Sequence, residues 1–127
     1  MTPNRKKPTV LICDDEEGVR ESFRVFLADA YELVFAKNGI EALELLKSRS
    51  PAAMLLDLKM PKQHGVEILK WVKQLKPGMP VIIVTGYQSV EMAREALKDG
   101  AADYIPKPFD PERVLKSIEQ ALRGGNK

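Results

Sequence analysis

Short apolar runs alternate with longer segments of helical periodicity along most of the chain. The runs span 9–13, 31–36, 52–57, 80–85 and 102–107, and most are rich in Val, Ile and Leu, as strands covered on both faces are. Between them, apolar residues recur every three or four positions, which predicts amphipathic helices. Three of the helical faces contain Val19, Phe23, Phe26 and Leu27, then Ile40, Leu43 and Leu46, and then Val66, Leu69 and Val72. The pattern therefore predicts strand–helix units that repeat along the chain.

The last two helices are marked by their ends as well as by their periodicity. A helix is predicted over 89–98, with Ser89 as its N-cap and Gly100 just past its end. Another is predicted over 111–122, where Asp110 is a candidate N-cap and a proline follows at the first helical position.

The apolar stripes of these two helices differ in strength. The stripe of the helix over 89–98 is the weaker one and consists of Val90, Ala93 and Leu97. The stripe of the helix over 111–122, which contains Val114 and Ile118, is predicted to be buried.

Alternation of strands and helices predicts an α/β fold with a five-stranded parallel sheet and helices on both faces. Crossovers between parallel strands are right-handed, and each internal strand has to be covered twice. We expect the flavodoxin-like, doubly wound strand order 2-1-3-4-5, which puts the second strand at an edge. In this order the chain reverses direction between the first and third strands, so a ligand crevice is predicted beyond their carboxyl ends.

Length and composition predict one domain that stays in the cytoplasm. The chain has 127 residues, of which 44% are hydrophobic and 30% charged, and no apolar run approaches the length of a membrane span. We expect a flexible leader over 1–8, a folded domain over 9–122, and a flexible tail or the start of a linker over 123–127. The leader is basic but runs into a strand, unlike the apolar core of a signal peptide.

Charge and cysteine content exclude some functions. The formal net charge is only +2, and part of the basic charge lies in the leader, so we expect no direct nucleic-acid binding by this domain. Cys13 is the single cysteine and ends an apolar run, which favours a small core residue in a reducing compartment.

Polar residues follow four of the five predicted strands at the edge where the crevice is expected. Asp14 and Asp15 follow the first strand, Asp57 ends the third, Thr85 ends the fourth and Lys107 ends the fifth. The second strand, at the edge of the sheet, ends without a comparable residue. Taken singly, the acids could cap a helix or a loop, and Thr85 and Lys107 could be ordinary surface residues. Their joint placement at the strand ends favours a site.

The predicted convergence of three carboxylates requires a compensating positive charge. Each pair at 4 Å repels by about 4 kcal/mol at an effective dielectric constant near 20. The ammonium group of Lys107 and a bound divalent cation could both offset this repulsion, and Mg²⁺ suits the oxygen ligands. A carboxylate beside such a cation can attack phosphorus, and Asp57 is the central candidate. Lys107 and Thr85 could then share the phosphoryl oxygens.

With these residues the chain resembles the receiver domain of two-component response regulators. The resemblance rests on the acidic pair Asp14 and Asp15, a D-x-x-M-P-x-x-x-G segment from Asp57 to Gly65, a T-G step at Thr85 and a K-P-F step at Lys107. It covers about residues 9–122. Any one of these motifs is weak, but all of them occur in order and each lies at a strand end.

The resemblance implies a phosphoacceptor site. Asp57 is expected to take a phosphoryl group from a phosphohistidine on a sensor histidine kinase or a histidine phosphotransfer protein. Asp15, Asp57 and the backbone carbonyl of Lys59 are expected to ligate Mg²⁺, with Asp14 helping through a water molecule. The expected chemistry is self-phosphorylation and autodephosphorylation, not turnover of external substrates.

The resemblance also implies a switch. Thr85 and Tyr104 are the expected switch pair, and they would reshape the surface made by the fourth helix, the fifth strand and the fifth helix. This surface would control an output domain or a partner, and it allows a homodimer to form on phosphorylation. The peptide bond between Lys107 and Pro108 is expected to be cis. Bulky side chains at Lys59 and Tyr87 are expected to restrict the attacking water and prolong the phosphorylated state.

Other functions fit the residues less well. A phosphatase of the haloacid dehalogenase type needs a second acid two positions after the nucleophile, where this chain has Lys59. A nucleotide-binding module needs a glycine-rich turn after the first strand, which is absent from 13–18. The remaining alternative is a phosphorylation-independent interaction module on the same fold. The sequence also leaves open whether the chain acts alone or belongs to a longer regulator.

Overall fold

The computed structural model describes residues 7–60, 63–86 and 90–124, with 59–60 and 63–65 described by their backbone alone. Five strands form one parallel sheet, namely β1 (Thr9–Cys13), β2 (Glu32–Ala36), β3 (Ala53–Leu56), β6 (Val81–Thr85) and β7 (Asp103–Pro106). The helices in these ranges are α1 (Glu17–Leu27), α2 (Gly39–Ser48), α3 (Gly65–Leu75), α4 (Val90–Lys98) and α5 (Pro111–Gly124). A short antiparallel pair, β4 (Lys59–Met60) and β5 (Gln63–His64), precedes α3.

The sheet has the predicted topology. Its strand order is β2-β1-β3-β6-β7, which is the order 2-1-3-4-5 when only the strands of this sheet are counted. All of its pairings are parallel, and Cys13 at the end of β1 is in register with both Ala36 and Leu56. The carboxyl ends of β1, β2 and β3 therefore lie level at one edge of the sheet. Four of the five predicted ranges start one residue before the observed strand. Asp57 and Lys107, which are predicted to end their strands, lie one residue past the ends of β3 and β7.

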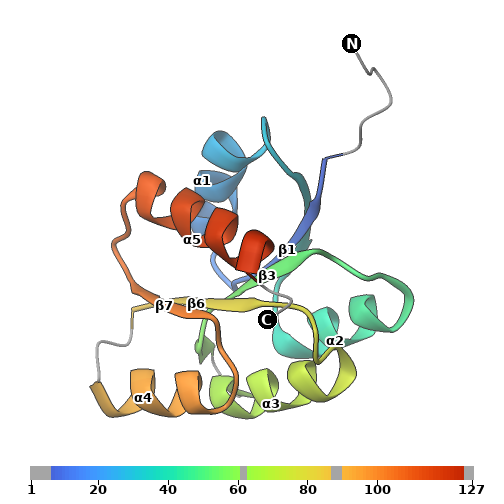
Figure 1. Cartoon of the computed structure of the whole chain (residues 1–127), viewed down its shortest axis with the longest axis vertical. Coiled ribbons are helices and arrows are strands. Elements are labelled where there is room, and N and C mark those ends of the chain that lie inside the picture. The colour runs from blue at the N-terminus through green and yellow to red at the C-terminus, as the bar shows by residue number, and fades with distance from the viewer. Residues whose placement is uncertain (1–6, 61–62, 87–89, 125–127) are drawn as a thin grey trace.

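Helices cover both faces of the sheet, as predicted. Figure 1 shows α1 and α5 together on one face and α2, α3 and α4 on the other. Each face has its own hydrophobic cluster, one around Phe23 and Ile118 and the other around Leu46 and Leu69. Cys13 lies in the second cluster, and burial is the main factor that raises the pKa of its thiol to about 12. It is therefore a neutral core residue, as expected.

The prediction for the core-facing side of α4 is wrong, because the predicted apolar stripe does not meet the core. Val90 is 69% exposed and Leu97 48% exposed, whereas Ala96 is fully buried and Met92 packs against the core. The i, i+4 pair of Met92 and Ala96 faces the sheet instead, and its small member lets the helix lie close to the strands. The prediction that Ile40 belongs to the buried face of α2 is wrong as well, because 64% of this residue is exposed.

Local hydrogen bonds set the helix ends. Asn38 caps α2, since its Oδ1 accepts from the N–H of Glu41 at 2.8 Å. Asp110 caps α5 as predicted, accepting from the N–H of Glu112 at 3.0 Å. Gly100 follows α4 with a φ of 109°, a conformation that favours glycine. The predicted N-cap Ser89 lies outside the described residues.

Within the described ranges, no helix combines the length and apolar character that crossing a bilayer requires.

Aromatic packing joins α1 to the loop before α5. The ring of Phe23 is 1% exposed and stacks on Phe109 with centroids 4.8 Å apart, and Phe26 packs against both rings at 5.8 Å. This trio closes the core beside the carboxyl end of the sheet. Its integrity therefore matters for both stability and the position of the loop that follows Lys107.

We expect Phe23→Ala to lower the free energy of unfolding by about 3–5 kcal/mol, because it removes a buried ring and leaves a cavity. Val25→Ala on the same helix is the control. Val25 is 84% exposed, so its truncation should change stability by no more than about 0.5 kcal/mol. Urea denaturation of both variants measures the difference, and equal effects would contradict the assigned packing of α1.

Candidate functional site

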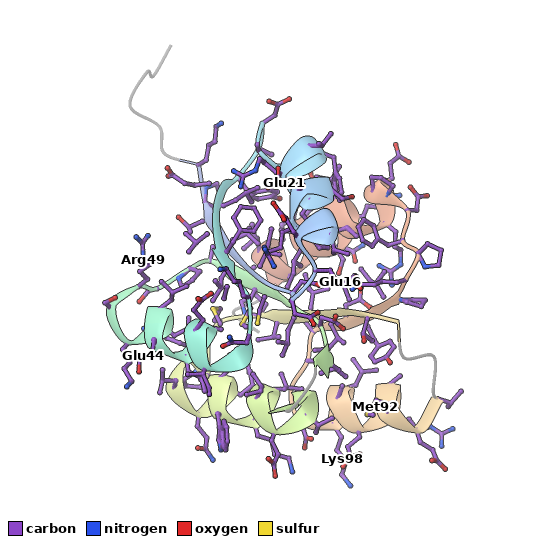
Figure 2. The ribbon with its side chains drawn as sticks, turned by 180° about the vertical axis from the view of Figure 1, so that it is seen from behind. Glu16, Glu21, Glu44, Arg49, Met92 and Lys98 are labelled. Atoms are coloured by element: carbon purple, nitrogen blue, oxygen red, sulfur yellow. The ribbon has the colours of Figure 1, made fainter. Side chains whose placement is uncertain are left out.

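Three carboxylates lie together beyond the carboxyl ends of β1 and β3. Asp14, Asp15 and Asp57 each offer an oxygen, and these oxygens all lie within 4.8 Å of one another. Asp14 is 2% exposed and Asp57 4%, whereas Asp15 is open to solvent. Figure 2 labels Glu16, which marks the turn from these acids into α1. The predicted acidic cluster is therefore present.

Backbone hydrogen bonds continue the sheet into this cluster. The N–H of Asp14 donates to the carbonyl of Ala36 at 3.1 Å, and the N–H of Asp57 donates to the carbonyl of Cys13 at 3.1 Å. The first residue after each strand is thus still held by the neighbouring strand. This is why two acids that are far apart in the sequence face each other across the crevice.

Lys107 brings its ammonium group to the same point from the far side of β6. Its Nζ lies 2.8 Å from Asp14 Oδ2 and 3.2 Å from Asp57 Oδ2. The side chain is only 18% exposed, and its backbone N–H donates to the carbonyl of Thr85 at 2.8 Å. The peptide bond from Lys107 to Pro108 is cis, as the family resemblance implied. Direct side-chain hydrogen bonds thus join Lys107 to two other sequence-predicted residues, Asp14 and Asp57.

The charges of the cluster alter the pKa values of two of its members. Burial disfavours the charged form of Lys107, but the hydrogen bond and charge of Asp14 and the charge of Asp57 outweigh burial and raise the pKa of Lys107. Burial raises the pKa of Asp14, and the hydrogen bonds from Lys107 and from the Glu16 N–H offset this only in part. The site therefore holds its lysine charged and makes ionisation of its most buried acid costly.

Sequence reasoning missed the residue that anchors the loop after β1. Arg20 on α1 donates from Nη1 to the backbone carbonyl of Asp14 at 2.8 Å, while the N–H of Glu16 donates to Asp14 Oδ1 at 3.0 Å. The backbone of Asp14 is thus fixed from the first turn of α1, and its side chain from the residue just before this helix. A basic residue one turn or so after an acidic pair is the only signal that could have suggested this contact.

Thr85 and Tyr104 lie on adjacent strands near the cluster. Thr85 ends β6 and is fully buried, and Tyr104 on β7 is half-buried and in register with Ile83. Burial, followed by the charge of Asp57, raises the pKa of Tyr104, so the phenol lies within electrostatic range of the acids. Their switch roles remain predictions.

A second polar network lies next to Tyr104. Asp103 at the start of β7 accepts two hydrogen bonds from Arg113, at 2.9 and 3.1 Å, and one from Ser117 Oγ at 2.7 Å. Its Oδ1 also accepts from the backbone N–H of Tyr104 at 2.8 Å. Partial burial opposes the charge of Asp103, but these donors outweigh it and lower the pKa of Asp103. The Asp103 network therefore fastens β7 to α5.

Two further residues named in the sequence analysis, Lys59 and Tyr87, lie partly or wholly outside the described residues. The backbone of Lys59 begins β4, two residues after Asp57, but its side chain is outside the description. Tyr87 lies outside the described residues altogether. The role of the Lys59 carbonyl and the effect of both side chains on hydrolysis remain predictions.

The site can hold a hard divalent cation. All three acidic residues supply carboxylate oxygens, the donor type that Mg²⁺ prefers. Three carboxylates and one lysine leave two negative charges uncompensated when the acids are ionised, which a divalent cation would balance. The donor set therefore fits the ion that the sequence suggested.

Comparison with known proteins is consistent with this geometry. The family model of the response regulator receiver domain matches residues 10–119. Response regulator MprA from Mycobacterium sp. (strain KMS) is 36% identical over 115 residues, which is 90% of this chain and 50% of MprA. The DNA-binding transcriptional regulator NtrC from Escherichia coli (strain K12) is 38% identical over 114 residues, which is 89% of this chain and 24% of NtrC.

Solved structures give the same picture. A response regulator receiver domain protein (CheY-like) from Methanospirillum hungatei JF-1 superposes with a TM-score of 0.90 at 33% identity, covering 95% of this chain and 98% of that one. NtrX from Brucella abortus superposes with a TM-score of 0.87 at 29% identity, covering 94% of this chain and 28% of NtrX. The chain thus spans about half the length of MprA and about a quarter of NtrC. From the family match, the sheet order and the strand-end residues together, the chain belongs to the response regulator receiver domain family.

Proposed function

We propose that this chain is the phosphoacceptor receiver of a two-component phosphorelay, with Asp57 as the residue that carries the phosphoryl group. The donor is a phosphohistidine on a sensor histidine kinase or a histidine phosphotransfer protein. The observation that supports this most is the cluster itself, in which a 4% exposed carboxylate lies beside two further acids and 3.2 Å from a lysine. Receiver domains are signalling modules and not turnover enzymes, which agrees with a site that modifies its own side chain.

The proposed transfer converts Asp57 into a mixed anhydride. A carboxylate oxygen of Asp57 attacks phosphorus, and an O–P bond forms as the N–P bond of the phosphohistidine breaks. The leaving imidazole nitrogen keeps the electron pair of that bond and takes a proton from water. Lys107, 3.2 Å from Asp57 Oδ2, is in position to pair with the phosphoryl oxygens afterwards. Thr85 is proposed to donate a hydrogen bond from its hydroxyl to the same phosphoryl group.

Asp15, Asp57 and the backbone carbonyl of Lys59 are the proposed ligands of Mg²⁺, with Asp14 acting through a water molecule. A bound magnesium ion supplies positive charge to the transferring phosphoryl oxygens. Burial of Asp14 and its contact with Lys107 agree with an indirect role, whereas the exposure of Asp15 leaves its oxygens accessible.

The proposed output is a change in the surface formed by α4, β7 and α5. Phosphorylation draws Thr85 towards the new negative charge, and the ring of Tyr104 turns inwards to fill the space. This surface then controls an output domain or an effector partner, and it is also the proposed site of homodimer formation on phosphorylation. We also propose that the domain acts in the cytoplasm and binds neither nucleic acid nor membrane directly; the modest net charge of +2 agrees with the absence of nucleic-acid binding.

We propose that this activity belongs to a receiver domain over 9–122. Residues 1–8 are proposed as a leader, and 123–127 as a tail or the start of a linker. The alternative is an interaction module that works without phosphorylation. Retention of all three acids and the lysine favours the phosphorylated mechanism.

Incubation with Mg²⁺ and acetyl phosphate should add one phosphoryl group, which intact mass spectrometry measures. Asp57→Asn should remove this increment, because it removes the nucleophilic carboxylate. Asp29→Asn, at an exposed position outside the cluster, should keep it. A folded wild-type chain that gains no phosphoryl group, or an increment that survives in Asp57→Asn, would support the phosphorylation-independent alternative.

Asp14→Asn should raise the stability of the metal-free protein at neutral pH and weaken Mg²⁺ binding. Since burial raises the pKa of Asp14 in the folded state, its ionised form costs folding free energy. The gain in the variant should shrink as the pH falls through that raised pKa. Urea denaturation across pH, with and without Mg²⁺, measures both effects.

Asp103→Asn is the matched control, and it should change the free energy of unfolding in the opposite direction. The pKa of Asp103 is lowered in the folded state, so its charge stabilises the fold above the unfolded-state pKa, and this contribution is lost as the pH falls through the folded value. The variant should therefore be less stable at neutral pH. If both variants changed stability in the same direction, the assigned electrostatics of the site would be wrong.

Thr85→Ala should separate phosphorylation from its output. The variant retains Asp57 and should still gain the phosphoryl group, but the backbone of α4 should respond less, because the hydroxyl link is gone. Hydrogen exchange of α4, measured before and after phosphorylation, tests this. An unchanged response of α4 would count against Thr85 as a switch residue.

A further inference from the structure

Arg20 brackets Asp15 with two hydrogen bonds. It lies in the first turn of α1, between Glu16 and Glu21, which Figure 2 labels. Its side chain donates from Nη1 to the backbone carbonyl of Asp14 at 2.8 Å, and its backbone N–H donates to the carbonyl of Glu16 at 3.1 Å. The carbonyls of the residues directly before and after Asp15 are therefore both held by one arginine.

Asp15 is the acid of the cluster that depends most on its backbone for its position. The carboxylates of Asp14 and Asp57 both accept from Lys107, at 2.8 and 3.2 Å. Asp15 is exposed, and among the described residues no group donates a hydrogen bond to its carboxylate. Its oxygens are thus placed by the main chain on either side of it, which is the segment that Arg20 holds.

We propose that Arg20 is a positioning residue of the metal site, and that its hold on the Asp14 carbonyl makes the site prefer Mg²⁺ to the larger Ca²⁺. This inference rests on the proposed function, in which Asp15 is a direct ligand of Mg²⁺. Mg²⁺ requires nearly octahedral geometry with oxygens about 2.0–2.1 Å away, whereas Ca²⁺ accepts oxygens at about 2.3–2.6 Å in flexible arrangements. Loosening a ligand should therefore weaken the binding of Mg²⁺ more than that of Ca²⁺.

The side-chain contact of Arg20 acts on geometry, because it goes to a neutral carbonyl. Lys107, by contrast, contacts the carboxylates themselves and offsets their repulsion. The positive charge of Arg20 lies beside the acidic cluster, so by itself it should weaken the binding of any cation. Geometry and charge thus make opposite predictions for the removal of this side chain, which allows an experiment to separate them.

The first test is the affinity of the full chain for Mg²⁺ and for Ca²⁺ without phosphodonor, measured from backbone amide shifts in NMR titrations that extend to high millimolar concentrations. Arg20→Met should weaken Mg²⁺ binding by roughly tenfold, as the loss of a group that orients a metal ligand commonly does, and Ca²⁺ binding by a smaller factor. Arg24→Met is the matched control. It removes the same charge one turn further along α1, where the guanidinium contacts Glu21 at 3.2 Å, and it should leave the ratio of the two affinities unchanged.

A double-mutant cycle tests whether Arg20 acts through Asp15. Asp15→Asn should itself weaken Mg²⁺ binding, because it removes a charged ligand. In the Asp15→Asn background, Arg20→Met should then change the Mg²⁺ affinity by less than about twofold, since the ligand that it positions is already lost. Circular dichroism verifies that the variants fold. Arg20→Gln is a second variant with the same expected result, because Met, Gln and Arg have similar helix propensities.

Several results would overturn this inference while leaving the metal site in place. Equal or tighter Mg²⁺ binding by Arg20→Met would show that the arginine acts through its charge or not at all. An equal loss of Mg²⁺ and Ca²⁺ affinity, or an undiminished effect in the Asp15→Asn background, would show a general role in the structure of the loop. A wild-type chain that binds neither ion would instead overturn the proposed metal ligands and this inference with them, whereas the phosphoryl increment at Asp57 tests the phosphoacceptor assignment separately.

Discussion

The contact of one lysine with two buried carboxylates is the constraint on which the rest of the site depends. Lys107 is held between Asp14 and Asp57 at 2.8 and 3.2 Å, in a crevice where the acids are almost fully covered. Without that charge the acids would repel each other strongly, and their buried charges would be left uncompensated. The fold therefore has to deliver the end of β7 to the ends of β1 and β3, and the parallel register of the sheet does so.

The same constraint explains how the backbone around the crevice is organised. The residues after β1 and β3 keep sheet hydrogen bonds, Arg20 fixes the carbonyl of Asp14, and Thr85 accepts from the N–H of Lys107. The backbone that carries these polar side chains is thus held in place by hydrogen bonds. The carboxylates held in this way fit a divalent cation, which agrees with the family to which the chain belongs.

Much of the fold and the central cluster could be predicted from the sequence, because both follow from patterns of residue type. Apolar runs alternating with helical stripes predict a parallel sheet, and its register brings Asp14, Asp57 and Lys107 together. Arg20 escaped prediction because it binds a backbone carbonyl, and a basic residue that follows an acidic pair is only a weak signal of such a contact. The β4–β5 pair is too short for alternation to show. Val90 and Leu97 misled the prediction for α4, since apolar residues on both sides of a helix do not reveal which side meets the sheet.

The Asp103 network gives β7 and α5 a mechanical connection. Arg113 and Ser117 hold Asp103 from the helix, and Asp103 in turn holds the backbone N–H of Tyr104. A shift of α5 caused by a bound molecule would therefore reach the backbone of Tyr104 through Asp103, without involving the acidic cluster. The coupling is reciprocal, so a molecule bound to α5 and a displacement of the backbone at Tyr104 would each affect the other.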